Sequence, residues 1–204
     1  MSLANPAAFY DLMRTGLLGP TLSPGEVDGC TAILTAVESL PIAWTAYALA
    51  TAFHETASTM QPVTERGGPA YFTRLYDVNG ARPRLAAANG NTTPGDGARY
   101  AGRGFVQLTW RNNYAKAGKE CGVDLVTHPE LALSPEVAAK ILREGMKRGW
   151  FTGKNFADYL PTATEALLPD FIRARRIING TDKAEQIAGY AMEFQRALAA
   201  GGWR

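Results

Sequence analysis

Two carboxylic acids lie ten residues apart where an apolar part of the sequence gives way to a polar one. Glu55 follows the uncharged run PIAWTAYALATAF and His54, and Glu65 comes ten residues later in a polar segment. Apolar surroundings disfavour the charged form of a carboxyl group, so we expect Glu55 to keep a proton more readily than Glu65. A protonated carboxyl suits a general acid, and an ionised one suits a general base. Such a pair has the chemistry of glycoside hydrolysis, in which about 6.5–9.5 Å between the groups favours inversion.

Each carboxylate also has a plain structural interpretation. Glu55 could cap its helix at the surface, and Glu65 could be a solvated loop charge that pairs with Arg66 or Arg74. Position alone does not separate these readings from the catalytic one, so further motifs have to decide.

The histidines and cysteines do not indicate a metal site. The segment HETAS lacks the second histidine of the HExxH zinc pattern, and the only other histidine is His128. We therefore expect no metal, and we interpret His54 as a hydrogen-bonding neighbour that orients the loop and belongs with the substrate-binding residues. Cys30 and Cys121 are far apart and lack metal spacing, which favours two reduced thiols.

A second polar cluster lies in YAGRGFVQLTWRNNY, residues 100–114. Its amides and hydroxyl come from Gln107, Thr109 and Asn113, and its flat rings come from Tyr100, Trp110 and Tyr114. This mixture suits a carbohydrate better than a phosphate. The rings of Trp110 and Tyr114 could equally pack in the core, and the amides could tie loops together.

Helices are the elements that must position these groups. Ser23, Pro24 and Glu26 form a capping box at a helix start. Residues 42–53 are apolar or small on every side, which is typical of a buried helix. After the stop signal Asn179-Gly180, Thr181 is placed to cap the last helix.

Residues 61–109 read differently, because glycine, proline, asparagine and arginine cluster there. A loop-rich stretch of this length inside a helical domain is usually functional or disordered. The aromatic and arginine content favours an ordered wall of a functional site. Any sheet would be short and would lie here, so the predicted fold class is mainly α with little or no β.

Composition narrows the class of protein. The chain has 204 residues, is 46% hydrophobic and 20% charged, and carries a net charge of +2. The length predicts one domain, residues 1–204, and the charge gives no argument for nucleic acid. Because the sequence shows no repeat and no Ser/Gly linker, we expect no separate wall-binding module. The apolar run 41–53 is too short to span a bilayer, and the N-terminus lacks a signal-peptide pattern. We expect a monomer, made in a bacterial cytoplasm, without stable membrane insertion.

Three motifs together resemble a known family. FHET followed by a second glutamate, then GRGFVQLTWRNNY, then RRIINGTDKA occur in this order between residue 53 and about residue 184. They are similar to the family 19 glycoside hydrolases, which include chitinases and related phage and bacterial endolysins. The resemblance implies a lysozyme-like, two-lobed fold with a central substrate cleft, inversion at the anomeric carbon and no cofactor.

The resemblance also implies roles for individual residues. Glu55 matches the general acid, Glu65 is the best candidate for the general base, and Thr109 matches the residue that holds the attacking water. The polar substrate-binding positions are matched by Gln107, Asn113 and, in IING, Asn179.

The function expected from the motifs is that of an endolysin. Its substrate would be the β-1,4 glycan strands of peptidoglycan, and the enzyme would be an N-acetylmuramidase that reaches the cell wall after release from the host bacterial cytoplasm. The alternatives are a chitinase that hydrolyses N-acetylglucosamine polymers, a secreted antibacterial wall hydrolase, and a glycan-binding protein without activity. The polymer that yields new reducing ends separates the first two.

Overall fold

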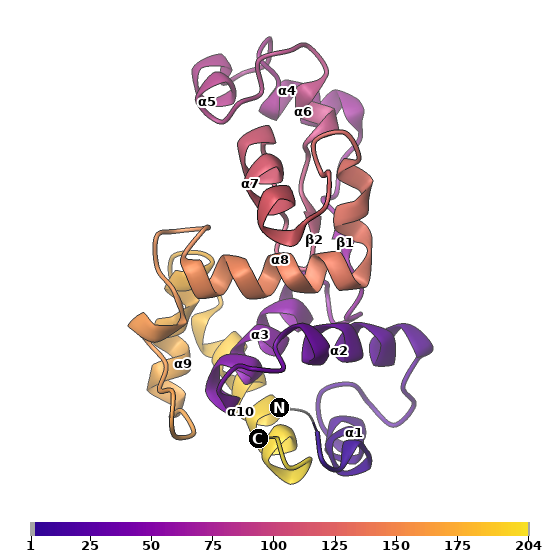
Figure 1. Cartoon of the computed structure of the whole chain (residues 1–204), viewed down its shortest axis with the longest axis vertical. Coiled ribbons are helices and arrows are strands. Elements are labelled where there is room, and N and C mark those ends of the chain that lie inside the picture. Colours follow the sequence, from indigo (N-terminus) through magenta and orange to yellow (C-terminus); the bar gives the residue numbers. More distant parts are fainter. Residues whose placement is uncertain (1–2, 204) are drawn as a thin grey trace. The chain divides into compact units, whose positions relative to one another are not determined.

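The computed structural model describes residues 3–203, and helices make up most of them (Figure 1). The chain divides into two compact units. Unit 1 holds residues up to Gln61 and from Leu142 onward, and unit 2 holds Pro62–Ile141. The predicted mainly α class with little β is confirmed. The expectation of one catalytic domain stays a prediction.

Unit 1 contains the first three helices of the chain and the helices that follow Leu142. Its elements are α1 (Pro6–Thr15), α2 (Pro24–Ala36), α3 (Ile42–Glu55), the 3-10 turn η2 (Phe156–Asp158), α9 (Leu168–Ala174), the 3-10 turn η3 (Arg175–Ile177) and α10 (Ala184–Ala200). The unit boundary falls within α8 (Pro135–Arg148).

The start of α2 follows the predicted capping box. The Ser23 hydroxyl accepts from the amide of Glu26, and the Glu26 carboxylate accepts from the amide of Ser23 at 2.7 Å. This satisfies two amides that a helix N-terminus leaves without intrahelical partners. Further along α2, Gly29 lies against the backbone of Met60, where an added Cβ would be 1.6 Å from the carbonyl oxygen. Only glycine permits this approach.

Helix α3 is the buried helix that the sequence predicts. All but one of the residues from Ala43 to Phe53 are buried. Phe53 of α3 contacts two aromatic rings of α10. Its ring centroid lies 4.9 Å from that of Tyr190 and 6.0 Å from that of Phe194. Figure 1 shows α3 in purple and α10 in yellow in this part of the molecule. The apolar helix thus carries Glu55 at its C-terminal end, on a rigid support.

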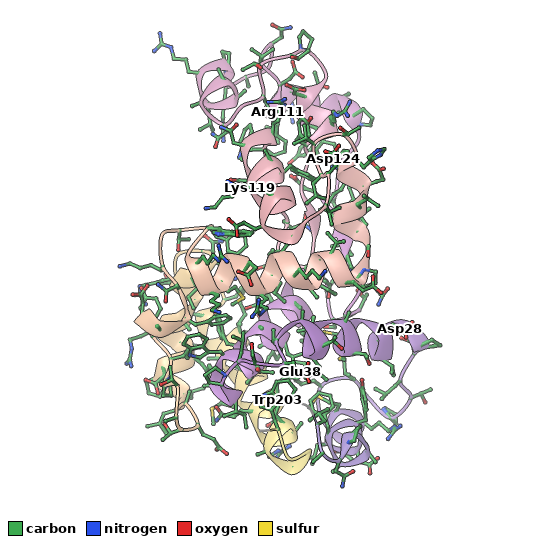
Figure 2. All side chains as sticks on the ribbon, in the orientation of Figure 1. Asp28, Glu38, Arg111, Lys119, Asp124 and Trp203 are labelled. Atoms are coloured by element: carbon green, nitrogen blue, oxygen red, sulfur yellow. The ribbon has the colours of Figure 1, made fainter. Side chains whose placement is uncertain are left out.

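The C-terminal segment closes the core of unit 1. Trp203, which Figure 2 labels, is 7% exposed, and its indole N–H donates to the carbonyl of Leu40 at 3.2 Å. The Trp44 indole donates to the carbonyl of Leu160 and stacks on Phe156 with centroids 5.1 Å apart. The buried indole of Trp203 and the half-buried indole of Trp44 therefore both have partners for their polar atom.

Unit 2 contains the short strands and several short helices. Its elements are β1 (Val63–Thr64), α4 (Pro69–Tyr76), α5 (Pro83–Ala88), α6 (Asp96–Arg99), β2 (Arg103–Gly104), α7 (Arg111–Cys121) and the 3-10 turn η1 (Pro129–Leu133). The two strands pair antiparallel, with Val63 opposite Gly104 and Thr64 opposite Arg103. The short sheet lies where the sequence predicts it.

Two expectations about local structure are wrong. The 61–109 segment is less loop-like than expected, because α4 and α5 both begin at a proline, and proline at the first helical turn favours a helix. The cap of α10 is also different. Lys183, at φ 57°, takes the N-cap position that we expected Thr181 to fill, and no side chain caps the helix there.

Buried polar side chains hold the loops of unit 2 together. Asn91 donates to the carbonyl of Tyr76 at 2.9 Å and accepts from the amide of Arg111 at 3.0 Å. Asp77, 1% exposed, accepts from the amides of Gly95 at 2.7 Å and Gly97 at 3.2 Å. These bonds fix the C-terminal end of α4 against the start of α7.

Within residues 3–203, none of the helices is both long enough and apolar enough to cross a membrane. Both cysteines are free, as expected, with Cys30 buried and Cys121 partly exposed.

Candidate active site

Glu55 stands at the C-terminal end of α3 and is held by an arginine from the other part of unit 1. Arg175 donates through Nη1 to Glu55 Oε1 at 2.9 Å. The Arg175 side chain is 4% exposed, whereas that of Glu55 is 22% exposed. The carboxyl group therefore has one side fixed on a buried cation and the other side open.

Arg175 is itself anchored. Its Nε donates to the backbone carbonyl of Asp182 at 2.9 Å, just before α10 begins. A buried arginine needs such partners, because an unpaired buried charge is costly. The anchor fixes the direction from which the guanidinium meets Glu55.

This arrangement corrects the picture of an acid desolvated by an apolar helix. The apolar residues of α3 support Glu55 from behind, but the group that contacts the carboxylate is a cation. The Arg175–Glu55 pair determines which oxygen of the Glu55 carboxyl group can carry a proton. Since Arg175 donates to Oε1, a proton on the carboxyl group belongs on Oε2, which accepts no hydrogen bond from any residue the structure describes.

Two buried hydroxyls lie on the same helix below Glu55. Tyr47 and Thr51 precede Glu55 by eight and four residues, so they share its side of α3. Both are 0% exposed, and neither hydroxyl has a hydrogen-bond partner among residues 3–203. We call Tyr47, Thr51, Glu55 and Arg175 the Glu55 cluster.

Glu65 is held in a different way, by neutral donors of unit 2. The hydroxyl of Tyr76 donates to Oε1 at 2.8 Å, and the amide of Gly102 donates to Oε2 at 3.3 Å. The backbone of Glu65 also donates to the carbonyl of Gly102 at 2.8 Å. Both carboxylate oxygens accept a hydrogen bond, which suits an ionised group. We call Glu65, Tyr76, Gly102 and Gln107 the Glu65 cluster.

Gly102 is in this cluster because an added side chain would crowd its two polar neighbours. An added Cβ would lie 2.9 Å from Gln107 Oε1 and 3.0 Å from Glu65 Oε2. Gln107 in turn donates through Nε2 to the carbonyl of Val63 at 3.1 Å. The glycine thus lets the carboxylate and the amide approach the backbone together.

The loop that follows β2 carries the polar residues predicted from the sequence. The Thr109 hydroxyl donates to the carbonyl of Gln107 at 2.9 Å, and Asn113 Nδ2 donates to the carbonyl of Thr109 at 2.8 Å. Gln107 and Trp110 have φ angles of 54° and 77°, which non-glycine residues rarely adopt. Such strain costs about 1–3 kcal/mol a residue and is typical of functional loops.

The aromatic residues of this region divide into two groups. Trp110 is half-buried, and its ring meets that of Tyr76 edge-on with centroids 5.0 Å apart. Tyr100 and Tyr114 are 3% and 0% exposed, and their hydroxyls donate to the carbonyls of Val126 and Ala101. Their rings are core residues, which corrects the expectation that they offer flat faces to sugar rings.

Burial explains the protonation of these phenols. It raises the pKa of Tyr114 to about 12, although the Arg103 charge and hydrogen bond oppose the rise. Burial and the bond to Glu65 both raise the pKa of Tyr76. Tyr76 therefore stays a hydrogen-bond donor to Glu65 well above neutral pH.

The two remaining predicted residues belong to unit 1. His54 is half-buried beside Glu55, and its carbonyl accepts from the amide of Ala57. Asn179 is exposed, and its side chain accepts from the amide of Gly180 at 2.8 Å. Their roles toward substrate stay predictions, as do those of Glu55, Glu65, Thr109, Gln107, Trp110 and Asn113.

Sequence reasoning missed two members of the clusters. Arg175 is 120 positions from Glu55, and Tyr76 is 11 positions from Glu65. The only signal for Arg175 was its place in the motif RRIINGTDKA, where Arg175 and Arg176 directly precede IING. That motif was noted for Asn179 alone. Nothing in the local sequence marks Tyr76. Among residues 3–203, no group of three or more potential metal-binding side chains lies close together.

A mainly α chain with two carboxylates, each fixed by donors, has the features of a glycoside hydrolase. Residues 42–144, about half of the chain, match the family model described as chitinase class I, glycoside hydrolase family 19. The chain belongs to this family. The family assignment made from the motifs and the prediction of a glycoside hydrolase are thereby confirmed.

Curated relatives carry chitinase names. An Arabidopsis thaliana endochitinase is 51% identical over 110 residues, which are 50% of this chain and 34% of the relative. An Avena sativa endochitinase is 30% identical over 143 residues, which are 69% of this chain and 64% of the relative. The matched part of the chain thus spans less than two thirds of the length of either relative.

Solved structures show the same fold. Chitinase C from Streptomyces griseus aligns with a TM-score of 0.57 at 21% identity, over 97% of this chain and 77% of the other. A bacterial family 19 chitinase aligns with a TM-score of 0.54 at 23% identity, over 99% and 96%. At this identity the likeness concerns the fold alone. The names found are those of chitinases, which favours the chitinase alternative over the endolysin expectation.

Proposed function

We propose that this chain hydrolyses β-1,4 bonds between N-acetylglucosamine units of chitin-type glycans, with inversion at the anomeric carbon. Glu55 is the general acid and Glu65 the general base. The observation that carries the proposal is that a member of this family keeps both carboxylates, each held by specific donors.

The acid step follows from the geometry of Glu55. A bond from Arg175 to Oε1 leaves Oε2 to carry the proton and to donate it to the glycosidic oxygen. Once the proton has left, the carboxylate is formed beside a cation that is already in place. The charge that appears in the reaction is thus compensated without movement of the protein, which is how preorganised electrostatics lower a barrier.

The base step uses the Glu65 cluster. An ionised Glu65, oriented by Tyr76 and Gly102, accepts a proton from water as that water attacks the anomeric carbon. Thr109 holds the same water through its hydroxyl. Trp110 is the aromatic side chain of this loop that is left partly exposed for contact with a sugar ring.

The experiment compares two polymers under the same conditions. The purified chain is incubated with N-acetylglucosamine hexamer and, separately, with purified peptidoglycan, and products are reduced with borohydride and analysed by mass spectrometry. We expect shorter N-acetylglucosamine oligomers, and proton NMR should show the α-anomer first, since inversion converts a β bond into an α product. Absence of cleavage of the hexamer, or a β-anomer formed first, contradicts the proposal.

A second candidate, hydrolysis of peptidoglycan, is favoured by one feature of unit 1. A cavity of about 490 Å³ is lined by residues from α9 to the start of α10, namely Ile172, Arg176, Thr181, Lys183, Ala184, Glu185 and Gln186. Its two cations outnumber its one carboxylate, and N-acetylmuramic acid carries a lactyl carboxylate. Peptidoglycan products that end in reducible N-acetylmuramic acid would establish a muramidase, which would act on the wall after release from the host cytoplasm.

A further inference from the structure

The hydroxyls of Tyr47 and Thr51 require an explanation that packing does not supply. Buried polar groups in proteins are almost always hydrogen-bonded, to protein or to internal water, because an unpaired one is costly. Valine and phenylalanine would fill the same space on α3 without this cost. Yet both positions carry a hydroxyl, and both are 0% exposed without a partner in the described chain.

Two charged side chains act on the Tyr47 hydroxyl. The charges that act on the Tyr47 hydroxyl are those of Arg175 from η3 and Glu55 from α3 itself. On the α9 side, the ring of Phe171 stacks on that of Tyr47 with centroids 6.1 Å apart and 11° between the planes. The phenol ring is thus fixed by an apolar stack, while its oxygen feels the charges of both Arg175 and Glu55.

Burial raises the pKa of Tyr47, and the Arg175 charge and the Thr51 side chain oppose this rise only in part. Tyr47 is therefore a neutral phenol that can both donate and accept. Thr51 lies close to it but outside hydrogen-bond geometry. The two hydroxyls and the guanidinium whose charge acts on Tyr47 make three polar groups, and three hydrogen-bond partners are the usual number for an internal water.

We propose that Tyr47 and Thr51 are positioning residues for Glu55: they bind one internal water that bridges them to Arg175. We call Tyr47, Thr51, this water and Arg175 the column, and it holds the Arg175–Glu55 pair in one geometry. The inference rests on the proposed role of Glu55 as general acid. Two of the five N–H donors of Arg175 are bonded to Asp182 and Glu55 within the described chain, so donors remain for such a water.

The column has a definite effect on the acid. A guanidinium held in one orientation keeps Oε1 of Glu55 engaged and leaves Oε2 to carry the proton. Without the column, Arg175 gains freedom and stabilises the carboxylate less. We therefore expect the basic limb of the pH–rate profile, which reports loss of the acid's proton, to move to higher pH.

The test uses Tyr47→Phe and Thr51→Val, which remove one oxygen each and keep the shape. We expect kcat to fall about tenfold in each variant, less than the ~10²-fold that a 1 Å misplacement can cost, with KM unchanged. We also expect the basic limb to move up by about half a pH unit or more. Thr51→Ser, which keeps the hydroxyl, should restore the wild-type profile.

The matched control is Thr45→Val on the same helix. Thr45 is also 0% exposed, but its hydroxyl donates to the carbonyl of Leu40 at 3.5 Å. This variant should lose stability without any change in the pH profile. If Tyr47→Phe and Thr51→Val keep the wild-type kcat and profile, and only their melting temperatures rise, the hydroxyls are merely unpaired and the inference is wrong.

A readout without activity separates this inference from the proposed function. If Glu55→Gln keeps its activity, the acid assignment fails. The carboxyl carbon of Glu55 can still be followed by carbon-13 NMR during a pH titration of each variant. A titration midpoint unchanged by Tyr47→Phe and by Thr51→Val contradicts the column whatever the reaction is, and a higher midpoint supports it.

Discussion

Arg175 and Glu55 form an ion pair at 2.9 Å across 120 positions of the chain. The arginine is almost completely buried and the glutamate is partly open. The pair joins the end of α3 to η3 within unit 1, and it gives the proposed acid one fixed oxygen and one free oxygen. Both the stability of unit 1 and the chemistry of Glu55 should therefore depend on Arg175.

Replacement of Arg175 by alanine should lower the free energy of unfolding by about 2 kcal/mol. Loss of one partner from a fully buried pair costs about 3–5 kcal/mol, and the exposure of Glu55 reduces that cost. Urea unfolding measures the change. The control is Arg176→Ala, an exposed neighbour, which should stay within about 0.5 kcal/mol of wild type. Equal effects of the two variants would show that the pair is not stabilising.

Replacement of Tyr76 by phenylalanine should lower kcat about tenfold or more with little change in KM. The variant removes the donor to Glu65 Oε1 and keeps the ring that meets Trp110, so it affects the orientation of the base and not the packing. Steady-state kinetics on N-acetylglucosamine oligomers measure it. Tyr71→Phe, at an exposed position of the same helix, should have wild-type kinetics. A Tyr76→Phe variant with full kcat would show that Tyr76 does not orient the base.

Replacement of Gly102 by alanine should separate activity from stability. The new Cβ would meet the side-chain ends of Gln107 and Glu65, which can shift while the backbone stays in place. The melting temperature should change little, whereas the rate should fall at least tenfold because the carboxylate is displaced. Gly189→Ala, in an open position of α10, should keep the rate and raise stability by about 0.5–1 kcal/mol. A large fall in melting temperature for Gly102→Ala would point to a packing role instead.

Asp77 predicts a pH dependence of stability. Burial alone would raise the pKa of Asp77, but bonds from the amides of Asn79, Gly97 and Gly95 lower it below 3.8. A carboxyl whose pKa is lower in the folded state stabilises the fold above the unfolded pKa, and this contribution is lost as pH falls through the folded pKa. Asp77→Asn should therefore cost about 1–3 kcal/mol at pH 7. The difference from wild type should shrink toward pH 3, and a constant difference would contradict this assignment.

The sequence predicted the elements whose signals are local. The capping box at Ser23 and Glu26 and the all-round apolar pattern of residues 42–53 are read within one or two helical turns, and both are confirmed. The short helices between Pro69 and Arg99 were not predicted. Their prolines and glycines were interpreted as loop signals, whereas two of the prolines occupy the first turn of a helix.

The sequence could not show which side chains meet across long separations. It identified both carboxylates by type and spacing, but the partner of each comes from elsewhere in its unit. Whether an aromatic ring faces solvent or core is also decided by tertiary packing. That is why Trp110 is left partly exposed, while Tyr100 and Tyr114 of the same motif are buried.

The central claim is that Glu55 donates the proton that cleaves the glycosidic bond. The most direct measurement is kcat of Glu55→Gln on N-acetylglucosamine hexamer. The control is Glu193→Gln, because Glu193 is a carboxylate of α10 that also pairs with an arginine, Arg196. Glutamine keeps the acceptor for Arg175 but has no acidic proton, so the variant should fold like wild type. We expect kcat to fall about 10²–10⁴-fold or more, with full activity in the control. A Glu55→Gln enzyme that keeps a tenth of the wild-type rate would contradict the claim.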